Sequence, residues 1–135
     1  MIMGGSPSFQ ERLSRFFQDA HQLKIVDSGR EGLIQLQVFK PPMVLLGAHL
    51  PDMDGLEILK HIQQELPRSK TILFSTLQDM NTTIQAMKLG AFDCVLEDID
   101  LKDLDYKIKK ALRILNLNEK ISNSFYDKVI INYIN

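Results

Sequence analysis

Two aspartates stand two residues apart after the most apolar segment of the chain. Asp52 and Asp54 follow residues 43–46, and Gly55 comes directly after them. Paired carboxylates near the end of a strand are candidates for general acid and base chemistry. An aspartate directly before a helix can instead cap that helix through its side-chain oxygen. The pair therefore marks a region of interest without fixing its chemistry.

The other residues with reactive side chains are scattered. His21, His49 and His61 lack the spacing of a set of metal ligands, so we interpret them as surface histidines and expect no metal site. Cys94 lies between apolar neighbours, which favours a small buried residue over a reactive thiol. A single cysteine also excludes an internal disulfide.

An acidic run follows Cys94 toward the end of the chain. It can be a docking patch for a basic partner, or it can be the acidic start of a helix, which the helix dipole favours. We favour the second interpretation. The run consists of Glu97, Asp98, Asp100, Asp103 and Asp105.

Short apolar strands alternate with amphipathic helices, which predicts a parallel sheet because parallel neighbours need helical crossovers. The predicted strands are residues 1–3, 23–26, 43–46, 71–75 and 92–96, and each is followed by a predicted helix. The first strand is short for a central position. Residues 116–135 have helical spacing in one part and strand composition in another, so their structure is left open.

The length and composition limit the classes of protein to which this chain can belong. The chain has 135 residues, enough for one domain, and 44% of them are hydrophobic. Sixteen basic residues against seventeen acidic ones give no basic excess, so we expect no nucleic-acid binding by this segment. The apolar runs are too short to cross a bilayer, and no secretory signal is evident. These features predict a cytoplasmic protein without contact with a membrane.

The segment 42–55, PMVLLGAHLPDMDG, closely resembles the third strand and following loop of bacterial response-regulator receiver domains. Residues 71–75, 86–93 and 6–9 resemble further landmarks of that family in the same order. We therefore expect a receiver-like domain over residues 1–116 and a C-terminal extension or linker stub over 117–135. The resemblance implies an α/β fold with a doubly wound, five-stranded parallel sheet, flavodoxin/CheY-like, in the strand order 2-1-3-4-5.

The resemblance also implies where the residues of phosphoryl transfer should stand. Gly47 occupies the position of the phosphoacceptor aspartate, and Gly4 and Gly5 occupy the positions of the acidic pair that holds magnesium. Ser75 keeps the switch hydroxyl of the fourth strand. Glu97 replaces the lysine that contacts the phosphoryl group. The losses agree with one another, because a lysine without an anionic partner is a stranded charge.

Three further positions complete the comparison. Cys94 replaces the aromatic residue of the family's switch, and Asp98 replaces the proline that follows the lysine. In the resembling family, Asp52 and Asp54 belong to the loop motif and the helix cap. The resemblance thus implies a pseudo-receiver that is not an enzyme, needs no cofactor, and functions in two-component-type signal transduction independently of phosphorylation.

We expect this domain to act by protein-protein contacts. The surface by which receivers usually dimerise, formed by the fourth helix, fifth strand and fifth helix, is the expected site for a partner or for a homodimer. One alternative is a small-molecule sensor that uses the glycine-lined crevice, although Pro7 removes an amide donor there and no G-x-G-x-x-G or P-loop is present. Another is the regulatory half of a DNA-binding response regulator.

Overall fold

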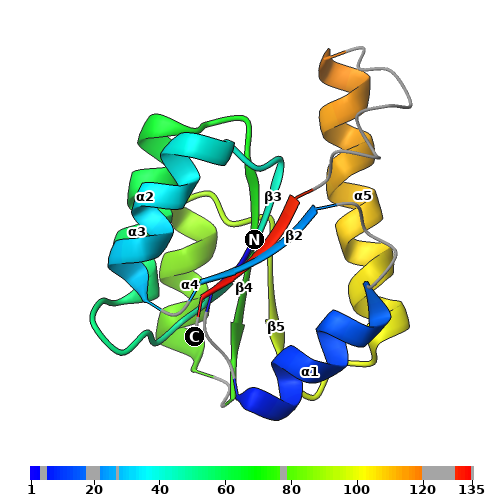
Figure 1. The fold of residues 1–135 in the computed structure, drawn as a ribbon. Helices are drawn as coiled ribbons and strands as arrows, with labels where there is room; N and C mark the ends of the chain where they lie inside the picture. Colours follow the sequence, from blue (N-terminus) through cyan, green and yellow to red (C-terminus); the bar gives the residue numbers. More distant parts are fainter. Residues whose placement is uncertain (4–5, 18–21, 27, 77–78, 120–129, 135) are drawn as a thin grey trace.

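The structure, a computed structural model, describes residues 1–3, 6–17, 22–26, 28–76, 79–119 and 130–134. Helices and strands alternate along the chain, as predicted (Figure 1). The strands are β1 (Ile2–Met3), β2 (Gln22–Val26), β3 (Met43–Gly47), β4 (Lys70–Ser75), β5 (Asp93–Leu96) and β6 (Ile130–Ile134). The helices are α1 (Pro7–Phe16), α2 (Gly29–Phe39), α3 (Gly55–Glu65), α4 (Met80–Lys88) and α5 (Leu101–Glu119).

All ladders between these strands are parallel. The strand β3 pairs with β4 from Met43↔Lys70 to Gly47↔Phe74, and β4 pairs with β5. Every residue of β3 is buried, which confirms that this apolar strand is central. The strand order is β1-β2-β6-β3-β4-β5, with additional pairings of β1 to β6 and β3.

The described sheet therefore has six strands, and the predicted count of five was wrong. The additional strand is β6, which lies within the predicted extension 117–135 and pairs with β2 over all five of its residues. Two reasons explain the difference. The strand β1 has only two residues, so it leaves most of β2 without a partner, and residues 130–134 have the β-branched composition that suits a strand.

Helices cover both faces of the sheet (Figure 1). One face packs against α1 and α5, and the ring of Phe9 in α1 lies 4.9 Å from that of Phe74 in β4. The other face packs against α2, α3 and α4. Alternate residues of β3 point to opposite faces, so that Leu45 joins the first core and Leu46 the second.

Side chains cap the starts of two helices that follow predicted strands. Ser28 accepts a hydrogen bond from the N–H of Glu31, and Asp79 accepts one from Asn81. Gly90, just after α4, has φ of 101°, the left-handed conformation common at the end of a helix. None of the helices described is long and apolar enough to cross a membrane.

Candidate functional site

The carboxyl ends of β3, β4 and β5 meet at one edge of the sheet. The N–H of Ala48 donates to the carbonyl of Phe74, and the N–H of Glu97 donates to the carbonyl of Ser75, both at 2.9 Å. These bonds hold the three strand ends side by side. A crevice of about 260 Å³ lies here, lined by Ser6, Gly47, Ala48, His49, Phe74, Ser75, Thr76 and Glu97.

The crevice brings together four of the residues singled out from the sequence, namely Gly47, His49, Ser75 and Glu97. Gly4 and Gly5 lie outside the described residues, and their neighbour Ser6 lines the crevice. Gly47 is buried and contributes backbone alone. A Cβ on Gly55 would collide with the Gly47 carbonyl, so the start of α3 packs directly against the end of β3.

Glu97 directs its carboxylate at the start of α1. Its Oε1 accepts a hydrogen bond from the N–H of Ser6 at 2.8 Å and another from the Ser6 hydroxyl at 3.1 Å. The same hydroxyl accepts from the N–H of Phe9, as the N-cap of α1. Negative charge is favourable at a helix N-terminus, where backbone N–H groups lack partners within the helix. Glu97 thus occupies the anion-binding end of α1.

A second contact, made by Arg12, holds the connection between β5 and α5 against α1. Arg12 of α1 donates from Nη1 to the carbonyl of Glu97 at 3.2 Å and from Nη2 to the carbonyl of Ile99 at 3.3 Å. The segment between β5 and α5 is therefore held against α1 by both a carboxylate and a guanidinium. Sequence reasoning included Ser6 in the landmark 6–9 without its contact to Glu97, and it missed Arg12, because their partners are 85 to 91 residues away.

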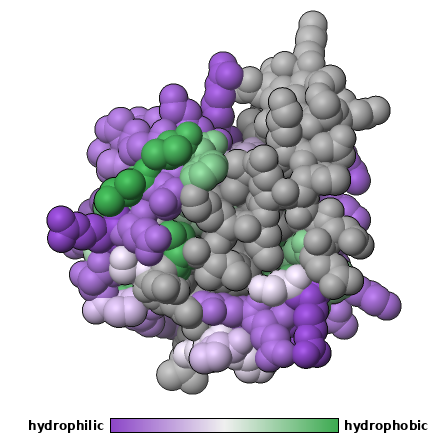
Figure 2. Space-filling view, in the orientation of Figure 1, coloured by the Kyte–Doolittle hydropathy of each residue, from purple (hydrophilic) through white to green (hydrophobic). Residues whose placement is uncertain are grey.

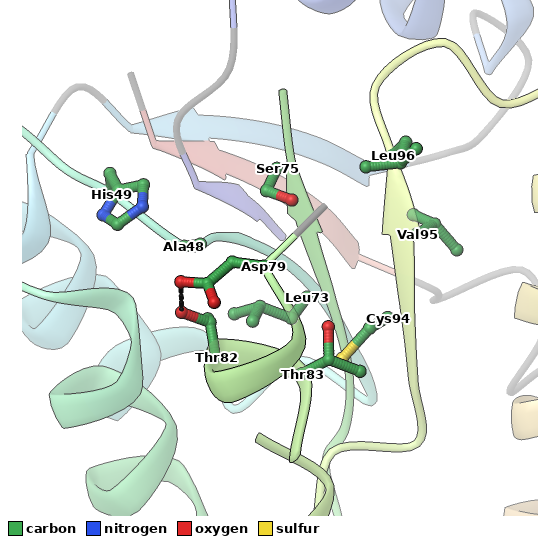
Figure 3. Close-up of a pocket in the computed structure, with 10 residues that line it drawn as sticks. All are labelled: Ala48, His49, Leu73, Ser75, Asp79, Thr82, Thr83, Cys94, Val95 and Leu96. Atoms are coloured by element: carbon green, nitrogen blue, oxygen red, sulfur yellow. Dashed lines mark hydrogen bonds between the residues drawn. The ribbon is translucent and has the colours of Figure 1, made fainter. Parts of the chain in front are cut away.

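A second cavity, of about 190 Å³, lies beside the crevice and beneath the start of α4 (Figure 3). Ser75, Thr83 and Cys94 all line it (Figure 3). Burial, followed by the charge of Asp93, raises the pKa of the Cys94 thiol to about 11. The remaining lining residues are Ala48, His49, Leu73, Asp79, Thr82, Val95 and Leu96.

The two aspartates of the loop after β3 both cap helices. Asp54 accepts from the N–H of Leu56 at 2.9 Å, which confirms the cap at the start of α3. Asp52 reaches α2 instead, where Oδ1 accepts from Gly29 at 2.8 Å and Oδ2 from Arg30 at 3.0 Å. These backbone N–H groups, that of Gly29 first, lower the pKa of Asp52. Neither carboxylate lines the crevice.

The acidic run after Cys94 has structural roles at several positions. Asp100 accepts from the N–H of Lys102 at the start of α5, and Asp105 forms an ion pair with Lys109. His49 lines both cavities, whereas His61 lies 3.2 Å from the Gln37 amide. Within the described ranges, no group of three or more His, Cys, Asp or Glu side chains is arranged to hold a metal ion.

The doubly wound fold, with a crevice at the carboxyl ends of its parallel strands, defines the structural class of this protein. The sequence model described as response regulator receiver domain matches residues 1–109, and the chain belongs to this family. The Regulatory protein AtoC of Escherichia coli (strain K12) is 30% identical over 122 residues, a match that covers 90% of this chain and 26% of AtoC. The Response regulator protein PilR of Pseudomonas aeruginosa is 31% identical, with coverages of 86% and 26%.

A third relative is an enzyme, Protein-glutamate methylesterase/protein-glutamine glutaminase 1 of Oleidesulfovibrio alaskensis. It is 32% identical over 118 residues, and the match covers 84% of this chain and 32% of that protein. The chain thus spans between a quarter and a third of the length of these three relatives.

Solved structures show the same fold. The signal receiver domain of an HD domain-containing protein from Pseudomonas fluorescens Pf-5 superposes with a TM-score of 0.82 at 21% identity, covering 90% of both chains. A CheY-like response regulator receiver domain protein from Methanospirillum hungatei JF-1 gives 0.81 at 20% identity, covering 87% of this chain and 94% of the other. The architecture is therefore that of a receiver domain.

Proposed function

We propose that this receiver domain signals without taking up a phosphoryl group and acts by protein contacts in the cytoplasm. The observation that carries the proposal is the hydrogen bonding of the Glu97 carboxylate to Ser6 inside the crevice. A negative charge stands where the family resemblance expects the lysine that binds the phosphoryl group.

Phosphoryl transfer to a receiver requires an in-line nucleophile, a metal ion and a cation beside the developing charge. Gly47 has no side chain to act as the nucleophile. By the resemblance, Gly4 and Gly5 replace the acidic pair, which leaves a metal with backbone oxygens and water. Glu97 repels an incoming phosphate, and its carboxylate already accepts the Ser6 donors that an anion at this end of α1 would use. The residues at these positions and the hydrogen bonds of Glu97 thus both argue against uptake of a phosphoryl group.

The test is intact-mass measurement after incubation of the full chain with acetyl phosphate and Mg²⁺. We expect no adduct of one phosphoryl mass on the wild type, with or without the metal. The control is a phosphorylatable receiver treated in the same tube, which proves that the donor is active. A stable adduct on this chain would overturn the proposal.

The protein contact is proposed for the surface of α4, β5 and α5. Met80, Ile84 and Met87 are exposed and fall on one stripe of α4, with Met80 at 65% exposure. Tyr106 of α5 is also exposed. Neighbouring exposed apolar side chains of this kind are a common feature of interaction surfaces.

A second exposed apolar patch gives a matched control. It lies over α2, where Figure 2 shows hydrophobic colouring on the surface, and it consists of Ile34, Val38 and Phe39. We expect Ile84→Glu to weaken self-association or partner binding at least tenfold, and Val38→Glu to leave it unchanged. Analytical ultracentrifugation across a wide range of concentration measures the self-association. The reverse pattern would move the proposed surface to α2.

Two other functions remain as alternatives. The crevice lined by Gly47 is the place where a small-molecule sensor would bind its ligand, and binding there would shift the thermal midpoint in a ligand screen. The regulatory half of a DNA-binding regulator is favoured by AtoC and PilR, which are named as regulatory proteins and are about four times as long as the matched part. Sequencing of the complete gene tests that alternative. We propose no catalysis by this chain, because its match covers only 32% of the methylesterase relative.

A further inference from the structure

The cavity beneath the start of α4 is separate from the crevice, although the two share a wall. Its volume is about 190 Å³, and the shared wall consists of Ala48, His49 and Ser75. The other residues that line the cavity come from β4, from β5 and from the start of α4 (Figure 3). The cavity thus lies between the sheet and a helix, on the face that packs against α2, α3 and α4.

The side of the cavity formed by the sheet is apolar. Leu73 of β4 and Cys94 of β5 are partners in register, and both pack into the core on this face. Leu96 lies two residues after Cys94, so its side chain points to the same face. Because burial raises the pKa of the Cys94 thiol to about 11, this side chain is neutral near pH 7 and adds apolar surface. Water on such a surface lacks hydrogen-bond partners, and an apolar ligand can displace it.

The side of the cavity formed by α4 carries one charge, that of Asp79. Its Oδ1 accepts a hydrogen bond from the N–H of Asn81 at 3.0 Å, and its Oδ2 accepts one from the Thr82 hydroxyl at 2.7 Å. These bonds, that of Thr82 first, lower the pKa of Asp79 and keep it ionised near neutral pH. None of the described residues that line the cavity is a lysine or an arginine. An anionic ligand would therefore meet a carboxylate without a cation to offset it.

A hydroxyl group on α4 is available to a ligand. The Thr82 hydroxyl is bonded to Asp79, whereas that of Thr83 makes no hydrogen bond within the part of the chain that the structure describes. Thr83 lines the cavity and not the crevice. A threonine hydroxyl can both donate and accept a hydrogen bond. A ligand on the apolar side of the cavity would thus find one polar partner opposite, at Thr83.

The volume of the cavity limits the size of the ligand. A cavity of about 150 Å³ between apolar side chains holds one benzene molecule. The cavity beneath α4, at about 190 Å³, has room for one six-membered ring and one small polar substituent. A flat ring fits between a sheet and a helix, and its rigidity means that it loses little internal freedom on binding.

We propose that the cavity beneath α4 is a binding site for a neutral molecule with a single aromatic ring and one hydroxyl group, which is the chemical class of the phenols. The ring lies against Leu73, Cys94 and Leu96, and its hydroxyl pairs with that of Thr83. This site is distinct from the crevice at Glu97 and goes beyond the proposed function.

The site also links a ligand to the surface of α4. The outer side of this helix carries the exposed side chains of Met80, Ile84 and Met87. A ligand beneath Thr83 changes how the same helix packs on the sheet, so that binding in the cavity alters the contact surface. This consequence rests on the proposed function, whereas the binding site itself does not.

The test is a titration of the isotope-labelled full chain with phenol, followed by two-dimensional NMR. We expect saturable shifts at the amides of Thr83, Cys94 and Leu96, and none at Ser6 or Glu97 in the crevice. Saturable shifts that are largest in the crevice, or shifts that do not saturate, would overturn the proposal.

Ligands of similar size test the chemical class. Cyclohexanol, which has a hydroxyl but no flat ring, should bind about tenfold more weakly than phenol. Benzoate should bind more weakly still because it brings a negative charge beside Asp79. Benzylammonium should also bind more weakly than phenol, because its charge is desolvated in the cavity. Equal or tighter binding of any of these three molecules would contradict a site for a neutral aromatic ring.

Substitutions on both sides of the cavity test its place. Cys94→Phe fills the space from the sheet and should weaken phenol binding about tenfold or more, whereas Cys94→Ser keeps the space and should leave the affinity within about twofold. Thr83→Leu fills the same space from the helix, so the test stands even where Cys94→Phe does not fold. Phenol affinity equal to that of the wild type in a folded variant of either filling kind would overturn the proposal.

Two further variants separate the hydroxyl contact and the contact surface. Thr83→Val removes the hydroxyl and nearly keeps the shape, so it should weaken the binding of phenol and leave that of benzene unchanged. An unchanged preference for phenol over benzene would exclude Thr83 as the partner. Ile84→Glu, on the outer side of α4, should bind phenol like the wild type. This variant distinguishes the two proposals, because loss of self-association there tests the contact surface, while loss of phenol binding there would contradict the cavity as the site.

Discussion

The carboxylate of Glu97 is bonded to both the backbone N–H and the hydroxyl of Ser6, at 2.8 and 3.1 Å. These residues are 91 positions apart in the sequence, and their contact joins the end of β5 to the start of α1. The Glu97 carboxylate provides a hydrogen-bond acceptor at the N-terminus of α1, where the first N–H groups lack partners within the helix. Glu97 thus links the crevice to the start of α1.

Removal of the Glu97 carboxylate should destabilise the domain. We expect Glu97→Ala to lower the free energy of unfolding by about 1 kcal/mol, because Glu97 is only partly buried and its bonds compete with water. Glu97→Gln should lose less, since an amide oxygen still accepts from Ser6. Urea denaturation measures both, with Asp98→Ala at the exposed neighbouring position as the control. Equal losses in all three variants would mean that the contact with Ser6 contributes nothing.

The cap by Asp52 should make stability depend on pH. The N–H groups of Gly29 and Arg30 lower the pKa of this carboxyl in the folded state. A depressed folded pKa stabilises the fold above the unfolded pKa of about 3.9, and the contribution is lost as the pH falls through the folded pKa. Asp52→Asn should therefore have a lower free energy of unfolding than the wild type at pH 7. This difference in free energy should become smaller below about pH 4. A constant gap across the pH range would contradict the charge-dependent cap.

The thiol of Cys94 should react slowly. Its pKa is raised from 9.0 to about 11, so the thiolate fraction near neutral pH is about a hundredfold below that of an unperturbed thiol. We expect alkylation by iodoacetamide at pH 7.5 to be slower by about this factor than for the same chain unfolded in urea. The rate should continue to rise beyond pH 9. Rapid labelling of the folded chain would show that the cavity beside Thr83 leaves the sulfur both accessible and ionised.

Two helix ends should respond to glycine in opposite directions. Lys40, the C-cap of α2, has φ of 45°, which a side chain with a Cβ adopts at a cost, so Lys40→Gly should stabilise the chain by about 0.5–1 kcal/mol. Gly90 has φ of 101°, and a Cβ there would lie 2.9 Å from the side chain of Gln63. Gly90→Ala should destabilise by about 1–2 kcal/mol. Thermal unfolding of the two variants checks both signs, and a shift of the same sign in both would contradict the assigned backbone conformations.

The alternation of strands and helices could be predicted from the sequence because local residue patterns determine it. The apolar run of β3 has no polar face, and Ser28, Asp54 and Asp79 are residue types that cap helices. Even so, Asp52 caps a helix that lies 22 to 23 residues earlier in the chain. Its partner could be found only after the fold had placed α2 beside the loop that follows β3.

The sixth strand could not be predicted for a related reason. Residues 130–134 have strand composition, but their neighbours have helical spacing, and only pairing with β2 decides between the two. The contact of Glu97 with Ser6 is equally non-local. The family resemblance implied that Glu97 replaces a lysine, whereas the hydrogen bonds that the Glu97 carboxylate makes depend on how β5 and α1 meet.

The last prediction concerns restoration of phosphoryl uptake in steps. Gly47→Asp alone supplies a carboxylate, but under the proposed function Glu97 still repels the donor, and the acidic pair that the family resemblance places at Gly4 and Gly5 is still absent. Each missing group should cost several kcal/mol of transition-state stabilisation, and about 1.4 kcal/mol is a factor of ten in rate. We expect intact-mass labelling by acetyl phosphate to stay near background for Gly47→Asp and to rise at least tenfold when Glu97→Lys is added. Circular dichroism of each variant establishes that it is folded. Efficient labelling of the single variant would show that the crevice lacks only its nucleophile, and that Glu97 does not oppose transfer.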